Sequence, residues 1–400
     1  MTDAFLPYGR HSLDAGDVAA VVEVLENGPL TSGPMADRFE AAFADVVGAR
    51  EAVVVANGTA ALHLAAIAAG IGPGDQVIVP AITFLSSASA MLMAGAEVVF
   101  ADVDPDSGLM TADTLRAALD RAPQAKAVVG VHLNGHLLDM AALSPILDQA
   151  ELVMITDCCH ALGARHGDGA APGSGRHERL GTFSLHPVKA IAMGEGGVIT
   201  CRDGETAARL RRLRSHAMER NAANWTNKAL AFDRESGDPN PWYYEMAELG
   251  FNYRASDLHC ALGLSQLAKL DRFIAARAHI AARYDDLIGR HLPPHLVRPV
   301  ARGSETSGGW HLYPVQVDFQ AAGTSRARVM ARLKADGIGT QVHYIPLHRQ
   351  PFFAERHDGT ALPGADGYYA AALSLPIYPD LPEDGPDRVV AALSRALGLA

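Results

Sequence analysis

Cysteine is scarce in this chain of 400 residues, which contains four: Cys158, Cys159, Cys201 and Cys260. Their spacing fits no zinc or redox motif, and adjacent cysteines rarely bond each other. We therefore expect a reduced, cytoplasmic protein without structural disulfides and without a metal site.

Long apolar runs and an excess of basic charge are also missing. No apolar run is long enough to cross a bilayer, and the opening MTDAFLPYGRHS lacks the basic start and apolar core of a signal peptide. The formal net charge is -11, from 34 Lys and Arg against 45 Asp and Glu. This balance argues against a nucleic-acid binder and against a membrane-surface protein.

Apolar residues make up 48% of the chain, which is enough for a packed core and more than one lobe. Short apolar segments alternate with segments of helical periodicity over the first 200 residues. The segments that we predict to be strands are 51–55, 76–79, 97–101, 126–131, 152–156, 180–185 and 198–201. This alternation predicts an α/β fold with a mostly parallel sheet covered by helices on both faces.

The rest of the chain is organised differently. Further predicted elements are a helix over 12–26 capped by Ser12, an arginine-rich helix over 205–214 with a mainly solvated face, a long loop over 222–244, a long helix from Ser256 that bridges two lobes, and a strand over 340–344. After about residue 290 the pattern becomes that of a small α/β lobe. We therefore expect a large domain over residues 1–285, including the bridging helix, and a small C-terminal domain over 286–400.

The chemistry centres on Lys189, the one lysine in the stretch GTFSLHPVKAIAMGEGG that begins at Gly181. Burial disfavours a charged amine, and a neutral lysine is a nucleophile that forms Schiff bases with carbonyls. By itself such a lysine is more often a surface residue in a loop. Asp157, which follows an apolar strand, and the Asn57-Gly58-Thr59-Ala60 junction between a strand and a helix change that balance.

A strand, a polar glycine turn and a helix together aim free backbone N–H groups at an anion such as a phosphate. Ligands of parallel sheets bind at the carboxyl ends of the strands, so we expect Thr59, Phe84, Asp157 and Lys189 to converge on one site. An amine, a carboxylate and a phosphate-sized helix end are the working parts of an enzyme that uses pyridoxal 5'-phosphate (PLP).

In such an enzyme Asp157 would hold the proton of the pyridine nitrogen, although it is equally a strand-end cap. His160 would contact the ring or would be a core histidine, and Phe84 would stack on the ring or belong to the core. Ser184 has a hydroxyl to offer the phosphate. Lys189 would also move the proton between the donor carbon and the cofactor. A metal site built from consecutive residues 157–160 is disfavoured, because neighbours in line cannot surround one ion.

A set of motifs then resembles one family, the PLP-dependent nucleotide-sugar aminotransferases of the DegT/DnrJ/StrS type. The motifs are NGTAAL, DCCHALGA, FSLHPVK with GEGG, GFNYR before DLHCALGLSQL, HYIPLHRQPFF and LSLPIYP, and they cover nearly the whole chain. The resemblance implies an aspartate-aminotransferase-like fold (fold type I) and a homodimer with shared sites. It also implies Lys189 as the Schiff-base lysine, Asp157 at the pyridine nitrogen, Gly58, Thr59, Ala60 and Ser184 at the phosphate, and Asn252 reaching that phosphate from the neighbouring subunit.

Within the family, PYGRHSLD, FSLHPVKAIAMGEGG, RSHAMER and WYYEMAELGFNYR look most like the transaminases of pseudaminic acid synthesis. That resemblance implies transfer of an amino group from glutamate to carbon 4 of a UDP-linked 4-keto-6-deoxy-N-acetylhexosamine. The alternatives are a GDP-4-keto-6-deoxyhexose or another ketosugar, a PLP dehydratase, and a non-catalytic sensor on the same fold. Related dehydratases carry histidine in place of the lysine, so Lys189 speaks against the second of these.

Overall fold

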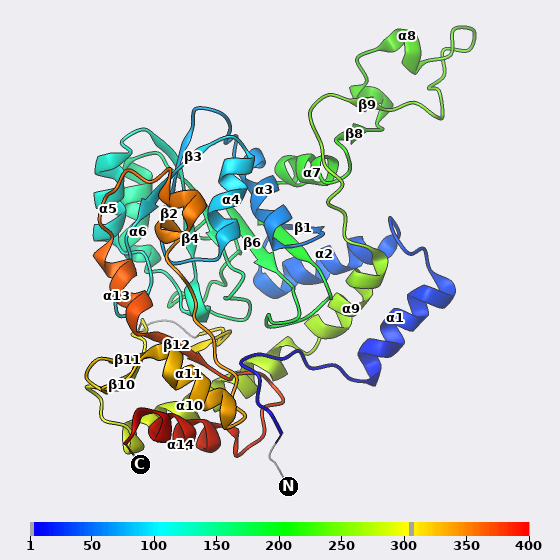
Figure 1. The fold of residues 1–400 in the computed structure, drawn as a ribbon. Helices are drawn as coiled ribbons and strands as arrows, with labels where there is room; N and C mark the ends of the chain where they lie inside the picture. Colours follow the sequence, from blue (N-terminus) through cyan, green and yellow to red (C-terminus); the bar gives the residue numbers. More distant parts are fainter. Residues whose placement is uncertain (1–3, 304–307, 400) are drawn as a thin grey trace.

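The larger part of the chain is built around a seven-stranded sheet (Figure 1). The computed structural model describes residues 4–303 and 308–399. In the order in which they lie side by side, the strands are β1 (Glu51–Val55), β7 (Gly197–Cys201), β6 (Leu180–Ser184), β5 (Val153–Asp157), β4 (Ala125–Val131), β2 (Gln76–Pro80) and β3 (Glu97–Ala101). Only β7 runs antiparallel to its neighbours, β1 and β6, while the other pairs are parallel. The prediction of a mostly parallel α/β sheet is confirmed.

Both faces of the sheet are buried, as the apolar character of its strands requires. Alternate side chains of β1 belong to different cores: Val53 and Val55 to one, Ala52 and Val54 to another. The first core includes residues of α3 (Gly58–Ala68), α4 (Leu85–Met93), α5 (Ala112–Arg121), α6 (Met140–Gln149) and α7 (Gly204–Leu213). The second includes residues of α2 (Pro34–Val47) and α9 (Asp257–Leu267).

The C-terminal part is a smaller layer of sheet and helices. Its antiparallel sheet has the order β10 (Val297–Pro299), β11 (Tyr313–Val317), β12 (Ala372–Leu375). Its helical segments are α11 (Arg326–Ala335), η3 (Leu347–Arg349), α12 (Pro351–Ala354), α13 (Pro363–Ala371) and α14 (Gly385–Leu397). Leu6 near the N-terminus completes this core, bonding to the backbone of Gly337 and Gly339. The predicted boundary after residue 285 stays a prediction.

The helix predicted from Ser256 is two helices. Ser256 caps α9 as expected, but α9 ends at Leu267. A second helix, α10 (Leu270–His291), begins at the next residue after Lys269, whose backbone is not helical. It is α10 that joins the two cores, because Phe273 belongs to the second core of the large part and Tyr284 to the small one. In the described ranges no helix is long and apolar enough to cross a membrane.

The predicted cap of the first helix and the predicted strand over 340–344 are wrong. The first helix, α1 (Ala15–Asn27), is capped by Asp14 rather than Ser12, because the Asp14 carboxylate accepts hydrogen bonds from Gly16 and Asp17. Residues 340–344 do not form a strand; Gln341 makes only an isolated bridge with Ser374. The sequence pattern of residues 340–344 does not distinguish an extended segment that pairs with a strand from one that lines a cavity.

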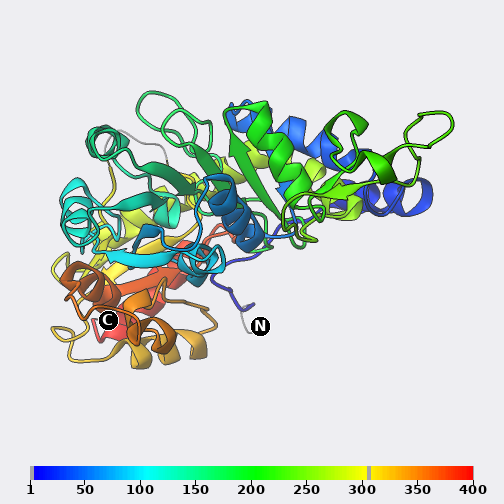
Figure 2. The ribbon, with the colours of Figure 1, turned by 90° about the horizontal axis from the view of Figure 1, so that it is seen from above.

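The predicted long loop over 222–244 has structure of its own. Strands β8 (Met218–Glu219) and β9 (Glu245–Met246) pair at its base, and η2 (Ala222–Asn224) and α8 (Lys228–Ala231) lie between them. Trp225 is 5% exposed and packs edge-on against Phe232 and Tyr243, which gives the segment a small core. In Figures 1 and 2 the segment extends away from the body of the large sheet, on the side opposite the small domain.

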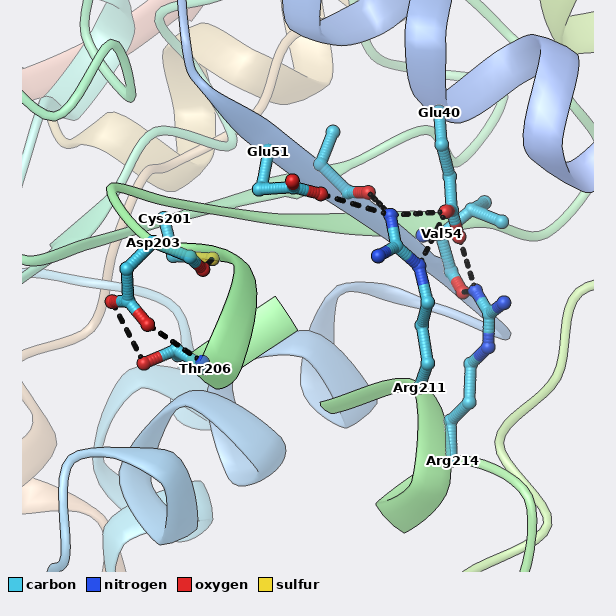
Figure 3. Close-up of polar contacts among 9 residues, drawn as sticks. Glu40, Glu51, Val54, Cys201, Asp203, Thr206, Arg211 and Arg214 are labelled. Carbon is cyan, nitrogen blue, oxygen red and sulfur yellow. Dashed lines mark hydrogen bonds and ion pairs between the residues drawn. The ribbon is translucent and has the colours of Figure 1, made fainter. Parts of the chain in front are cut away.

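Most arginines of the arginine-rich helix α7 and its C-cap, which were predicted to be solvated, form ion pairs with carboxylates. Asp203 caps its start, and Arg211 donates to Glu40 and Glu51 over 2.9 and 3.2 Å (Figure 3). Arg214 donates to the other Glu40 oxygen. Glu40 on α2 is 4% exposed, so these two arginines pair with a buried carboxylate. The network ties α2, β1 and α7 together.

Candidate active site

A cavity with a volume of about 690 Å³ opens at the carboxyl ends of the central strands. The segments that follow β1, β2, β5 and β6 line it, together with an extended segment of the small domain. Among its lining residues are Asn57, Gly58, Thr59, Phe84, Asp157, His160, Ser184, Lys189, His311, His343 and Tyr344. The predicted convergence of Thr59, Phe84, Asp157 and Lys189 on one cavity is therefore observed.

Lys189 lies in the loop between β6 and β7, where its backbone N–H bonds to the carbonyl of His186 over 2.8 Å. Burial lowers the pKa of its ammonium group, and the nearby carboxylate of Asp157 opposes this shift. A lowered pKa increases the fraction of neutral amine at neutral pH, which is the nucleophilic form. The geometry thus gives the cavity one amine that is prepared to attack a carbonyl.

Asp157 ends β5 and is 5% exposed. Its Oδ2 accepts a hydrogen bond from Ser87 Oγ over 2.7 Å, and its Oδ1 accepts one from the Cys159 backbone N–H over 3.1 Å. Ser87 was not predicted as a site residue. It lies in the first turn of α4, and nothing in the local sequence pattern indicates that it would meet a residue 70 positions away.

The helix α3 supplies the anion-binding end of the cavity. Asn57 Oδ1 caps the helix by accepting from the Ala60 N–H over 2.8 Å, so that amide is already bonded. Ala60 is buried and is not among the residues that line the cavity, whereas Gly58, Thr59 and Ser184 are. A side chain on Gly58 would come within 2.8 Å of Ser184 Cβ, so only glycine allows this approach.

His160 lines the cavity and is buried, with 6% of its surface exposed. Its Nδ1 accepts the Asn134 backbone N–H over 3.2 Å, and its Nε2 lies 3.2 Å from the hydroxyl of Tyr344. Burial lowers the pKa of His160 well below its usual value. The His311 ring lies 4.2 Å from the His160 ring between centroids. Sequence reasoning missed His311, His343 and Tyr344 as site residues.

Phe84 and Asn252 occupy contrasting positions. Phe84 lines the cavity, is 52% exposed and lies with its ring centroid 5.9 Å from that of Tyr344. It therefore presents an aromatic face rather than belonging to the core.

Asn252 is exposed, bridges to Ser215 and is not among the lining residues of this chain's cavity. No cluster of three or more His, Cys, Asp or Glu residues suited to a metal ion occurs in the described part of the chain.

The comparisons with known proteins agree with this geometry. The model of the DegT/DnrJ/EryC1/StrS aminotransferase family matches residues 11–394. The chain belongs to this family. The aminotransferase is similar to the solved structure of DesV from S. venezuelae, with 30% identity, a TM-score of 0.84 and 99% of each chain covered.

Two further structures are similar over their whole length. The aminotransferase TlmJ from Streptoalloteichus hindustanus is 28% identical, with a TM-score of 0.86 and 99% of each chain covered. PseC from Helicobacter pylori, described as an aminotransferase involved in the biosynthesis of pseudoaminic acid, is 25% identical, with a TM-score of 0.86 and 98% of this chain and 99% of that chain covered. This protein is accordingly a PLP-dependent sugar aminotransferase.

The chemistry of the cavity fits PLP on three independent features. A buried carboxylate, Asp157, suits a protonated ring nitrogen, and the amine of Lys189 suits an aldehyde. The first turn of α3 suits a phosphate, because Gly58 has no side chain and its backbone is open to the cavity. All three line a single cavity, so the residues present match the cofactor that the family uses.

Proposed function

We propose that this aminotransferase moves an amino group from glutamate to the 4-keto carbon of a UDP-linked 4-keto-6-deoxy-N-acetylhexosamine, in pseudaminic acid or surface-glycan biosynthesis. The observation that carries the chemistry is the meeting of Lys189, Asp157 and the N-terminus of α3 in one cavity. The choice of sugar is supported by the stretches FSLHPVKAIAMGEGG and WYYEMAELGFNYR, and by the similarity to PseC.

In this proposal Thr59, Ser184 and the Gly58 backbone bind the phosphate, and Phe84 covers one face of the cofactor ring. Asp157 holds the proton on the ring nitrogen. When bound, PLP supplies a carbonyl carbon and an electron-withdrawing ring. Lys189 Nζ anchors the cofactor and then holds and moves the proton of the donor's α-carbon, which its lowered pKa favours near neutral pH.

The remaining roles concern the phosphate and the assembly. Ala60 stays a candidate for the phosphate, although its N–H bonds to Asn57 in this structure. We further propose that two copies form a homodimer and that Asn252 of each serves the phosphate in the other's cavity. This proposal is supported by the position of Asn252 outside its own chain's cavity.

The test is a substrate panel. The PLP-loaded protein is incubated with glutamate and, separately, with UDP- and GDP-linked 4-ketosugars, and the aminated product is identified by mass and NMR. The visible spectrum is recorded as glutamate is added, with alanine as the matched control donor. Amination at carbon 4 of a UDP sugar supports the proposal. Transfer only to GDP-4-keto-6-deoxymannose would assign the protein to the GDP-sugar branch, and a spectrum that ignores glutamate would contradict the donor.

A further inference from the structure

A hydrogen-bond chain of fixed direction leads from the backbone to Tyr344. Asn134 N–H points at His160 Nδ1 over 3.2 Å, so this ring nitrogen must carry a lone pair rather than a proton. His160 is 6% exposed, and its burial keeps the ring neutral because the pKa falls well below the usual value. A neutral imidazole has one proton, which is therefore on Nε2.

This assignment decides what the Tyr344 hydroxyl does. His160 Nε2–H donates to Tyr344 Oη over 3.2 Å, so the phenol oxygen accepts and its own proton is left for a second acceptor. Burial raises the pKa of Tyr344 well above its usual value, and the negative charge of Asp157 adds to the shift. The hydroxyl therefore keeps its proton at neutral pH.

The position of Tyr344 is held from both domains. Leu347, three residues on, donates its backbone N–H to the Ala81 carbonyl in the large domain over 2.8 Å. His343 Nδ1 lies 2.9 Å from Ser374 Oγ on β12 of the small domain. The Tyr344 ring also lies nearly parallel to that of His160, with 27° between their planes. A group fixed in this way is suited to orient a ligand.

We propose that Tyr344 is a ligand-binding residue of this site, whose hydroxyl donates a hydrogen bond to an anionic oxygen of a bound ligand, and that His160 is the positioning residue that sets the direction of this bond. The inference rests on the proposed aminotransferase site. Two ligands of the cavity carry an oxygen of this chemistry: the cofactor, on its ring, and the glutamate donor, on its carboxylates. A Tyr344 that only packs against Phe84 and His160 would make no such bond.

The experiment replaces Tyr344 by Phe, which keeps the ring contacts and removes only the hydroxyl. Its matched control is Tyr284→Phe: Tyr284 is fully buried in the small-domain core, donates to the Pro376 carbonyl over 2.9 Å and does not line the cavity. In the first arm the apoproteins are titrated with PLP, and the visible absorbance of the bound form is followed against pH. In the second arm glutamate is added to the loaded proteins, and the KM and limiting rate of the absorbance change are measured separately.

Loss of a hydrogen bond to a charged acceptor costs about tenfold or more in binding. We expect Tyr344→Phe to lose about this factor in PLP affinity and to shift the absorbance pH profile if the acceptor is the cofactor. If the acceptor is the donor, the glutamate KM rises by this factor and PLP affinity is unchanged. Wild-type values in both arms, with Tyr284→Phe also unchanged, would overturn the proposal.

The role of His160 has its own test. Glutamine carries an acceptor and a donor, as neutral histidine does, whereas leucine carries neither. We expect His160→Gln to keep the response that Tyr344 controls, and His160→Leu to reproduce the loss seen in Tyr344→Phe without adding to it in the double variant. Equal behaviour of the Gln and Leu variants would refute the positioning role. Neither arm uses a sugar, so the result can be interpreted even if the proposed sugar substrate is wrong. If the wild-type protein does not respond to glutamate, the PLP titration alone tests the proposal.

Discussion

Ser87 Oγ donates to Asp157 Oδ2 over 2.7 Å, and Thr83 Oγ1 lies 2.7 Å from the same serine oxygen. Because the single Ser87 proton is used on the carboxylate, Thr83 must be the donor to Ser87. Ser87 is fully buried and Thr83 is 1% exposed, so water does not replace these bonds. Ser87 in the first turn of α4 therefore holds the carboxylate at the end of β5, and Thr83, just before the helix, holds Ser87.

This relationship predicts that Ser87 orients Asp157. Ser87→Ala should lower the rate of the absorbance change with glutamate by about tenfold, because one charged hydrogen bond is lost. Ser87→Thr keeps the hydroxyl and should restore most of the rate. The rate is measured by stopped flow, with the pH profile of the visible band as a second measurement. A wild-type rate and profile in Ser87→Ala would show that the Cys159 amide alone suffices to hold Asp157.

Lys189 is expected to be required for turnover and dispensable for folding. Lys189→Ala should bind PLP without the absorbance band of the covalently attached form and should lose turnover by at least a thousandfold. Its thermal unfolding should match that of the wild type, since the side chain lies in a half-buried loop. Lys334→Ala, at an exposed position on α11, is the control. Retained turnover in Lys189→Ala would refute the proposed chemistry.

Subunit mixing tests the shared site. Asn252→Asp puts a like charge near the phosphate and should weaken PLP binding and activity. When Lys189→Ala and Asn252→Asp chains exchange freely in equal amounts, a mixed dimer has one site with both residues intact, so about a quarter of all sites should recover. Activity of the mixture is compared with that of each parent. If Asn252 serves its own chain, every site carries a defect, and the mixture stays as inactive as the parents.

Glu40 is expected to be a stability residue. It is 4% exposed, accepts the Val54 N–H over 3.0 Å and pairs with Arg211 and Arg214. Glu40→Ala leaves two guanidinium groups without this carboxylate and should lower the free energy of unfolding by about 3–5 kcal/mol. Denaturant melts check this value. Asp113→Ala, from an exposed pair with Arg116, is the control and should change stability by roughly 0.5 kcal/mol or less.

A buried histidine should make the fold sensitive to acid. Burial, with the nearby His166 and His177 rings, lowers the pKa of His132 from its usual 6.5 to about 3 in the folded state. Below pH 6.5 the unfolded chain binds a proton that the folded chain does not, so stability falls as the pH drops from 6.5 towards 3. This residue contributes roughly 1.4 kcal/mol per pH unit to the slope.

His132→Asn isolates this contribution, because the amide oxygen still accepts the Leu138 N–H that His132 Nδ1 accepts over 3.1 Å. We expect the plot of unfolding free energy against pH, between pH 6 and 4, to be shallower in this variant by about one proton. His279→Asn, at an exposed position on α10, provides the comparison. An unchanged slope in His132→Asn would show that other groups dominate the acid sensitivity.

The sequence by itself determined the sheet, the family and the convergence of the main site residues. Strand segments such as Glu51–Val55 and the glycine turn before α3 are local patterns, because burial and backbone freedom are encoded residue by residue. Parallel strands bring their carboxyl ends to one edge, so Asp157 and Lys189 were placeable without coordinates.

Only the tertiary structure decided the partners of these residues. Ser87 meets Asp157 across 70 positions, and Tyr344 meets His160 across 184. Arg211 of α7 and its C-cap Arg214, which were predicted to face solvent, pair with Glu40 on α2. Such pairs depend on strand order and on how the small domain packs against the large sheet. Both are properties of segments far apart in the chain, which no local periodicity encodes.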